Sequence, residues 1–199
     1  MAYPTVSAPY GLKPVNLIGG QVFAGATRQF PIASGYAANL FNGDVVKLVS
    51  AGTIEKDTGT ATATPVGVFV GCSYTSPALG YTLYSQYYPT GTVASDIVAY
   101  VVDDPDTLFK VAVTAAGSAT MATVARTAVG NNSVLIQTAG STTTGDSKVS
   151  ISSTTATTAT QPVRIIDVVL ETAPTSGNYS EVIVKWNWGM HQYQNATGV

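Results

Sequence analysis

The sequence contains few of the side chains from which enzymes build active sites. Its 199 residues include 9 Lys and Arg, 11 Asp and Glu, 1 His and 1 Cys. Acid-base and nucleophilic catalysis need positioned His, Cys, Lys or carboxyl groups with shifted pKa values, and metal sites need clustered His, Cys and acids. We therefore expect a binding or structural role, with no catalytic residue, no cofactor and no metal.

Features that would direct the chain to nucleic acid, to a membrane or to disulfide formation are also scarce. The net charge is −2, whereas nucleic-acid binding depends on clustered Lys and Arg. No cationic stretch precedes an apolar run at the start, and no apolar run is long enough to span a bilayer. Cys72 alone cannot form an intramolecular disulfide, which suits synthesis in a reducing compartment. We expect no nucleic-acid partner and no membrane partner.

What the sequence does contain is β-forming residues in short runs. Its polar residues are mostly Thr, Ser, Asn and Gln, and β-branched Thr packs well on a pleated surface. Short apolar runs separated by turn residues are typical of a sandwich or small barrel. We predict a mainly all-β fold, a β-sandwich or small β-barrel with an extended N-terminal arm and at most one short helix. Strands are predicted around 30–32, 45–49, 54–56, 66–72, 97–102, 109–113, 134–137, 148–151, 163–170 and 179–188.

The expected division of the chain follows from its composition. Residues 1–26 are predicted to form an extended N-terminal arm, because Pro4, Pro9 and Pro14 exclude helix and central strand. Residues 27–190 are predicted to form a single β domain, in which 110–160 is a possible insertion, and 191–199 a C-terminal tail. Such an arm docks on a neighbour or on its own domain, or else it is a frayed terminus.

Local patterns make three further predictions. Gly67 and Gly71, inside the strand predicted at 66–72, indicate bulges or a close backbone approach. The run 121–129, followed by Gly130, is the only segment of the sequence that favours a helix. The Thr-rich and Ala-rich segment 154–160 is predicted to be an exposed loop.

Aromatic residues are the strongest candidates for a binding surface. The segment 74–89 is rich in Tyr, which gives a large contact area at low entropy cost and keeps a hydroxyl for a partner. The alternative is a surface loop whose rings cover an edge of the core. Trp186 and Trp188 share one face of the predicted strand 179–188, as core or interface residues. The candidate interface residues are Tyr3, Pro4, Tyr10, Leu12, Tyr84, Tyr87, Tyr88, Trp186 and Trp188.

The acidic triplet Asp103, Asp104 and Asp106 is the nearest approach to a chemical site. Three carboxylates in four residues can hold a divalent cation such as Ca²⁺, which prefers oxygen ligands. A turn that ends a strand explains the same residues, and we favour it. A hydrolase built on these carboxylates is a weaker alternative, because no general acid, base or oxyanion donor accompanies them. His191 stands alone and is predicted to be solvated or packed instead of a ligand.

Two segments together resemble a known family. The run Asn-Gly-Asp-Val-Val-Lys-Leu at 42–48 is followed by Thr-Pro-Val-Gly-Val-Phe-Val-Gly-Cys at 64–72. This pair resembles the head decoration (cement) proteins of tailed bacteriophages. The segments 85–89, 101–106 and 158–164 are similar to virion structural proteins of phages that infect aquatic bacteria. The resemblance implies a β domain on the outer face of an assembled capsid, often a trimer, with an N-terminal arm that pairs with a capsid strand.

The expected function is therefore a structural virion protein that binds the outer surface of a phage capsid and stabilises it. The expected partner is the major capsid protein, the expected state a homo-oligomer with a trimer favoured, and the expected location the capsid exterior after synthesis in the host cytoplasm. Thr-rich surfaces with little charge suit assembly through multivalent contact. The alternative is a head-fibre or tail adhesin that binds host glycan, which predicts aromatic rings in a concave, solvent-open groove.

Overall fold

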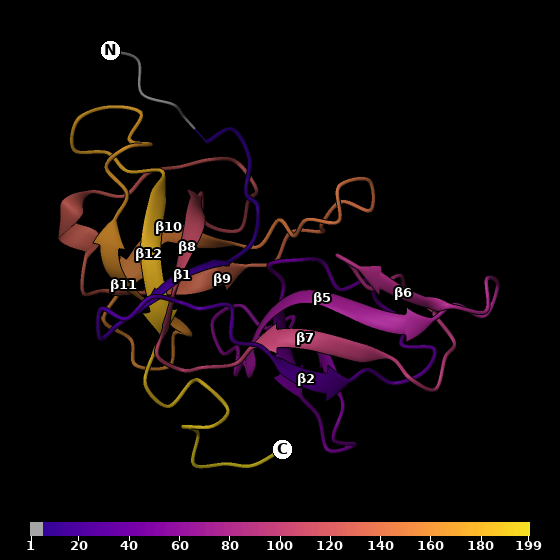
Figure 1. Cartoon of the computed structure of the whole chain (residues 1–199). Helices are drawn as coiled ribbons and strands as arrows, with labels where there is room; N and C mark the ends of the chain where they lie inside the picture. The colour runs from indigo at the N-terminus through magenta and orange to yellow at the C-terminus, as the bar shows by residue number, and fades with distance from the viewer. Residues whose placement is uncertain (1–5) are drawn as a thin grey trace.

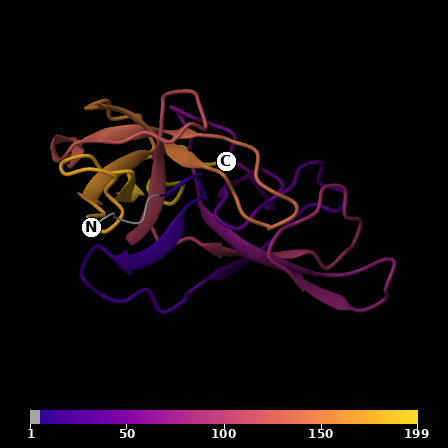
Figure 2. The same ribbon diagram turned by 90° about the horizontal axis from the view of Figure 1, so that it is seen from above.

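The chain folds almost entirely into β-strands, which confirms the all-β prediction. The computed structural model describes residues 6–199 and arranges their strands in two sheets (Figure 1). The first sheet contains β1 (Lys13–Leu17), β8 (Thr107–Thr114), β9 (Asn132–Ile136), β10 (Ser150–Ala156), β11 (Val163–Val168) and β12 (Glu181–Trp186). The second contains β2 (Arg28–Pro31), β3 (Val45–Leu48), β4 (Ile54–Lys56), β5 (Gly67–Thr75), β6 (Thr82–Ser85) and β7 (Val98–Val102). Figure 2 shows the two sheets side by side along the molecule.

The first sheet closes into a barrel of five strands. Their order is β8-β10-β9-β11-β12, and β12 pairs again with β8. The β8–β10 pair, in which Ile151 lies opposite Val113, is parallel. β1 pairs with the first half of β8 and places Pro14 opposite Phe109. A proline is tolerated there because β1 is an edge strand, whose outward side needs no backbone N–H.

The second sheet is open and has the order β2-β7-β5-β3-β4. β5 is its longest strand, and β6 pairs with the far half of β5, from Cys72 opposite Ser85 to Thr75 opposite Thr82. In Figure 1 this hairpin lies at the end of the molecule away from the barrel. The aromatic segment that the sequence suggested as a loop therefore includes a strand.

Two hydrophobic cores meet where the sheets join. The barrel core is built around Phe109 and Trp186, whose ring centroids are 5.4 Å apart. It also takes in Val45, Val68 and Val102, which come from strands of the second sheet. The second core lies under the remainder of that sheet and includes Phe30, Leu40, Ile54, Phe69, Tyr88 and Val101. The shared valines make the two sheets one packed unit, because buried side chains of each contact the other.

β5 confirms the prediction drawn from its glycines. The register of β5 against β7 shifts between Phe69 and Gly71, which is a β-bulge. At Gly67 the backbone lies against β7, so that an added Cβ would overlap the carbonyl oxygen of Val102 and come within 2.8 Å of Val101 Cγ1. Position 67 therefore has no room for a side chain.

Two local predictions are wrong. Instead of the helix predicted at 121–129, the chain forms one 3-10 turn, η1 (Arg126–Ala128). The backbone of Met121 and of Val124 forms β-bridges to Thr114 and Tyr179, and these replace helical hydrogen bonds. The exposed loop predicted at 154–160 begins later, because β10 continues to Ala156.

The ends of the described chain pack against the rest of the molecule. In the range predicted as an arm, residues 13–17 form β1, and the backbone N–H of Leu12 donates to the carbonyl of Gly43 at 3.0 Å. In the range predicted as a tail, the Gln192 side chain accepts from the backbone N–H of Leu48 at 2.6 Å and donates to its carbonyl at 3.1 Å. Both segments therefore belong to the folded unit.

Candidate interaction surfaces

A buried carboxylate links the two sheets. Asp44 lies in the turn before β3 and is fully buried. One of its oxygens accepts from Lys56 Nζ at 2.9 Å and from the backbone N–H of Phe41 at 3.0 Å. The other accepts from Ser147 Oγ at 2.6 Å, on the segment before β10 of the barrel. A buried charge is tolerated when it is paired and hydrogen-bonded, so Asp44 serves as a structural link.

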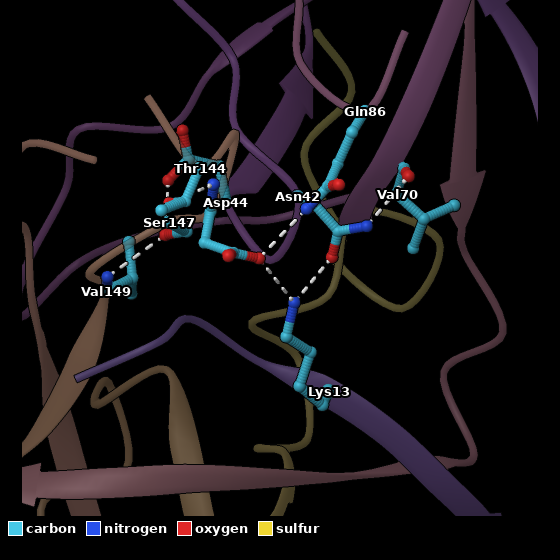
Figure 3. Close-up of polar contacts among 9 residues, drawn as sticks. Lys13, Asn42, Asp44, Val70, Gln86, Thr144, Ser147 and Val149 are labelled. Atoms are coloured by element: carbon cyan, nitrogen blue, oxygen red, sulfur yellow. Dashed lines mark hydrogen bonds and ion pairs between the residues drawn. The ribbon is translucent and has the colours of Figure 1, made fainter. Parts of the chain in front are cut away.

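A half-exposed polar cluster lies beside this link (Figure 3). Lys13 Nζ donates to Asn42 Oδ1 at 2.7 Å and lies 3.4 Å from Asp146 Oδ1. Gln86 Nε2 donates to the same Asp146 oxygen at 3.0 Å, and Asn42 Nδ2 donates to the Val70 carbonyl at 3.0 Å. These bonds join β1, β5 and the segment before β10. The cluster therefore uses its polar atoms to hold the fold together.

Three of the predicted interface residues are core residues instead of surface residues. Leu12 and Tyr88 are fully buried, and Trp186 is 3% exposed. Tyr88 packs beside Tyr36, with ring centroids 6.1 Å apart, while Trp186 ends β12 and packs on Phe109 in the barrel. Leu12 and Tyr88 therefore present no surface to a partner, and Trp186 presents only the small area that lines a cavity described below.

Tyr84 and Tyr87 lie on either side of the turn that follows β6. Tyr87 is half-buried and stacks on Phe41, with ring centroids 5.7 Å apart. Tyr84 is 79% exposed, and Leu79 and Tyr81 are also exposed on the same β5–β6 hairpin, residues 72–85. The hairpin therefore presents three large apolar side chains to solvent at one end of the molecule.

A second apolar surface lies where β12 ends. Strand pairing stops at Trp186, so Trp188 leaves the buried face predicted for it and is 78% exposed. Its ring borders a cavity of about 250 Å³, which we call the Trp188 groove. The groove is lined by Ile18, Arg164, Ile166, Lys185, Trp186, Asn187, Trp188 and Gln194.

The structure describes only some of the interface residues that were predicted near the N-terminus. Tyr3 and Pro4 lie outside the described residues. The Tyr10 hydroxyl donates to Glu181, a buried carboxylate on β12 that also lies 3.4 Å from Lys110 Nζ. Burial, and then the hydrogen bond to Glu181, raise the pKa of Tyr10 above its ordinary value. Tyr10 thus fastens the segment 6–12 to the barrel of its own chain.

The acidic triplet forms a turn between β7 and β8, and its side chains have separate partners. Asp103 pairs with Arg28 at 2.9 Å, and Asp106 pairs with Lys185 at 2.7 Å. Asp104 Oδ1 accepts from the backbone N–H of Asp106 at 2.8 Å, as in an Asx turn. These contacts support the turn interpretation over a shared cation site.

The side chains that could bind a metal ion or act as nucleophiles are dispersed in the described part of the chain. Among residues 6–199, no three or more His, Cys, Asp or Glu side chains lie close enough together to hold a metal ion. Cys72 is a free, buried thiol, and burial raises its pKa to about 12. A thiol at that pKa is protonated at neutral pH and is a poor nucleophile.

His191 is a packed residue. It is fully buried, its Nδ1 accepts from the backbone N–H of Tyr193 at 3.3 Å, and the two rings meet edge to face. Its Nε2 has no hydrogen-bond partner within residues 6–199. Burial lowers the pKa of His191 below its ordinary value, although the backbone at Val66 and the charges of Asp103 and Asp104 act in the opposite direction. The imidazole is therefore neutral in the folded protein at neutral pH.

We expect this histidine to make the fold sensitive to mild acid. The folded-state pKa is lowered, so the unfolded chain binds the proton first and the free energy of unfolding falls as pH drops below about 6.5. Urea unfolding at several pH values between about 7.5 and 5.5 measures this slope. In His191→Asn, which has no titrating ring, the slope should be smaller. Equal slopes in the two proteins would contradict the assignment.

Of the residues that line the Trp188 groove, the sequence pointed only to Trp186 and Trp188. Arg164 and Lys185 lie opposite each other on β11 and β12, which only strand pairing reveals. The sequence around Ile18 could have indicated a contact surface, because a large apolar residue directly before Gly19 and Gly20 is unusual in a solvated turn. Its exposure at the groove accounts for that signal.

No protein-family model, no curated protein and no solved structure matches the chain. Within residues 6–199, no helix has the length and apolar character needed to cross a membrane.

Proposed function

We propose that the chain is a structural virion protein that binds the outer surface of a phage capsid and stabilises it. The observation that carries this proposal is the β5–β6 hairpin, on which Tyr84, Tyr81 and Leu79 stay exposed. Exposed aromatic residues on a fixed β element are typical of protein-binding surfaces. The resemblance of the segments 42–48 and 64–72 to cement proteins supplies the partner, the major capsid protein.

The backbone of the hairpin adds a second means of attachment. Within residues 6–199, β6 pairs only with β5, so its outer edge has free N–H and C=O groups. Such an edge can accept an additional strand from a partner. The resemblance suggested the N-terminal arm for this role, but Tyr10, Leu12 and β1 are bound to their own chain. We therefore assign docking to the hairpin.

The low charge of the chain suits attachment through many equivalent contacts. With a net charge of −2, long-range attraction to a partner is weak. A homo-oligomer, with a trimer favoured, presents several hairpins to the capsid at once and gains affinity through effective concentration. This arrangement stabilises a shell by bridging neighbouring capsid subunits.

The test is co-sedimentation with empty, expanded capsids of the same virus. Tyr81→Ser combined with Tyr84→Ser should weaken capsid binding at least about tenfold, because aromatic residues dominate interface energies. Trp188→Ser, which removes an equally exposed ring outside the hairpin, should bind like the unsubstituted protein. The copy number at saturation identifies three-fold or other positions. Saturable binding that survives the double substitution would contradict hairpin docking, and absence of any co-sedimentation would contradict the proposed function.

A further inference from the structure

The Trp188 groove contains an arginine, Arg164, that has no ion-pair partner in the part of the chain that the structure describes. Arg28 pairs with Asp103 at 2.9 Å and Arg126 with Asp167 at 2.8 Å. Arg164 has no carboxylate within salt-bridge distance among residues 6–199, and it lines the groove. Its charge is therefore available to a ligand.

The guanidinium of Arg164 is held in a fixed orientation. Its Nε donates to Asn132 Oδ1 at 2.9 Å, and Asn132 is buried and donates in turn to the Thr158 carbonyl at 2.9 Å. The terminal N–H groups remain for a planar acceptor, which they can bind through two parallel hydrogen bonds. Such an arginine loses little conformational freedom when it binds an anion.

The turn that carries the exposed Trp188 is also anchored. The backbone N–H of Trp188 donates to Asn187 Oδ1 at 3.1 Å. Asn187 is buried, and its Nδ2 donates to the carbonyls of Ala159 and Gln161 at 2.8 and 3.1 Å. The indole is therefore carried by an anchored turn, and it lines the same groove as Arg164.

The charges around the groove favour a ligand with one negative charge. Among the described residues, no Asp or Glu lines the groove. Lys185 also lines it, but its ammonium is paired with Asp106 at 2.7 Å. Of the cations that line the groove within residues 6–199, Arg164 alone lacks a carboxylate partner. A single such cation matches a carboxylate better than a doubly charged phosphate, which usually recruits several cations or a helix N-terminus.

We infer that the Trp188 groove binds a carboxylated sugar, such as a uronic acid at the end of a glycan. The apolar face of the sugar ring stacks on Trp188, the carboxylate binds Arg164, and the Gln194 amide at the rim is placed to reach hydroxyl groups. A cavity of about 250 Å³ is near the lower end of ligand pockets and takes one ring, not a long chain. This site is separate from the hairpin and goes beyond capsid docking.

The probe is trigalacturonic acid, compared with the neutral galactose trimer, in calorimetric titrations of the full chain. We expect saturable binding of the acid and at least about tenfold weaker binding of the neutral trimer. Arg164→Gln and Trp188→Ala should each weaken binding of the acid at least about tenfold, and added salt should weaken it as well. Arg126→Gln, which changes an exposed arginine outside the groove, is the matched control and should bind normally.

A second readout uses the two tryptophans of the chain. Trp186 is buried and Trp188 exposed, so acrylamide quenches mainly Trp188, and bound sugar should protect it. Equal affinity for the neutral trimer, no saturable binding, or stronger binding of a peptide that offers only a C-terminal carboxylate would each overturn the inference. Capsid co-sedimentation of Arg164→Gln should be unchanged, which separates this result from the test of the proposed function. Urea unfolding of each variant verifies that it is folded.

Discussion

Asp44→Ala should lower the free energy of unfolding by about 3–5 kcal/mol, the usual effect of removing one partner from a buried ion pair. The substitution leaves the Lys56 ammonium without its carboxylate in a site where that side chain is only 14% exposed. It also removes the acceptor for the Phe41 N–H and the Ser147 hydroxyl. Ser147 lies on the segment that leads into the barrel, and Lys56 lies in the second sheet. The lost interactions are therefore those that connect the two sheets.

The matched control is Asp167→Ala. Asp167 is also paired with a cation, Arg126 at 2.8 Å, but both side chains are more than half exposed. Exposed pairs contribute about 0–1 kcal/mol, so this change should be small. Urea denaturation followed by tryptophan fluorescence gives both values. If the two substitutions have similar effects, Asp44 is not the structural link described above.

Gly67→Ala should be the most disruptive single-methyl substitution in β5. The added Cβ would overlap the Val102 carbonyl oxygen, and backbone on the neighbouring strand cannot move aside as a flexible side chain can. Overpacking costs about 1–3 kcal/mol and sometimes more, and we expect a value at or above the upper end of that range. The strand would have to separate from β7 locally to accommodate the methyl group.

Gly19→Ala provides the comparison for this effect. Gly19 has open space around its Cβ position and a backbone conformation that other residues adopt, so its replacement should change stability by less than about 0.5 kcal/mol. Thermal and urea unfolding of the two variants measure the difference. A Gly67→Ala protein as stable as Gly19→Ala would show that β5 and β7 are not packed as closely as described.

The sequence predicts the individual strands well because their signals are local. The alternation of Val182, Val184 and Trp186 places β12 with one buried face, and the glycines at 67 and 71 mark the close approach and the bulge in β5. Closure of the barrel is not predictable in the same way. It depends on β12 pairing with β8, and no local pattern in either strand specifies its partner.

The candidate surfaces were only partly predictable for a related reason. Tyr84 and Tyr88 are four residues apart and have the same chemistry, yet one is exposed and the other fully buried. The difference comes from residues distant in the sequence, such as Tyr36 and Leu40, that pack around Tyr88 in the second core. Trp186 and Trp188 differ because β12 ends between them. The residue types in the sequence identified the aromatic side chains that could form a binding surface. Tertiary packing determined which of these rings stay exposed to solvent.

The order of strands in the barrel constrains how the protein can fold during synthesis. All strands of the second sheet lie between residues 28 and 102, so its pairings can form while the ribosome is still producing the remainder. The barrel, in contrast, pairs β8 with β12, which lies about 70 residues later in the sequence. It cannot close until residues 181–186 of β12 have been synthesised, and such distant pairing is intrinsically slow. During that interval the valines that the second sheet contributes to the barrel core remain uncovered, which makes chaperone protection most valuable at this stage.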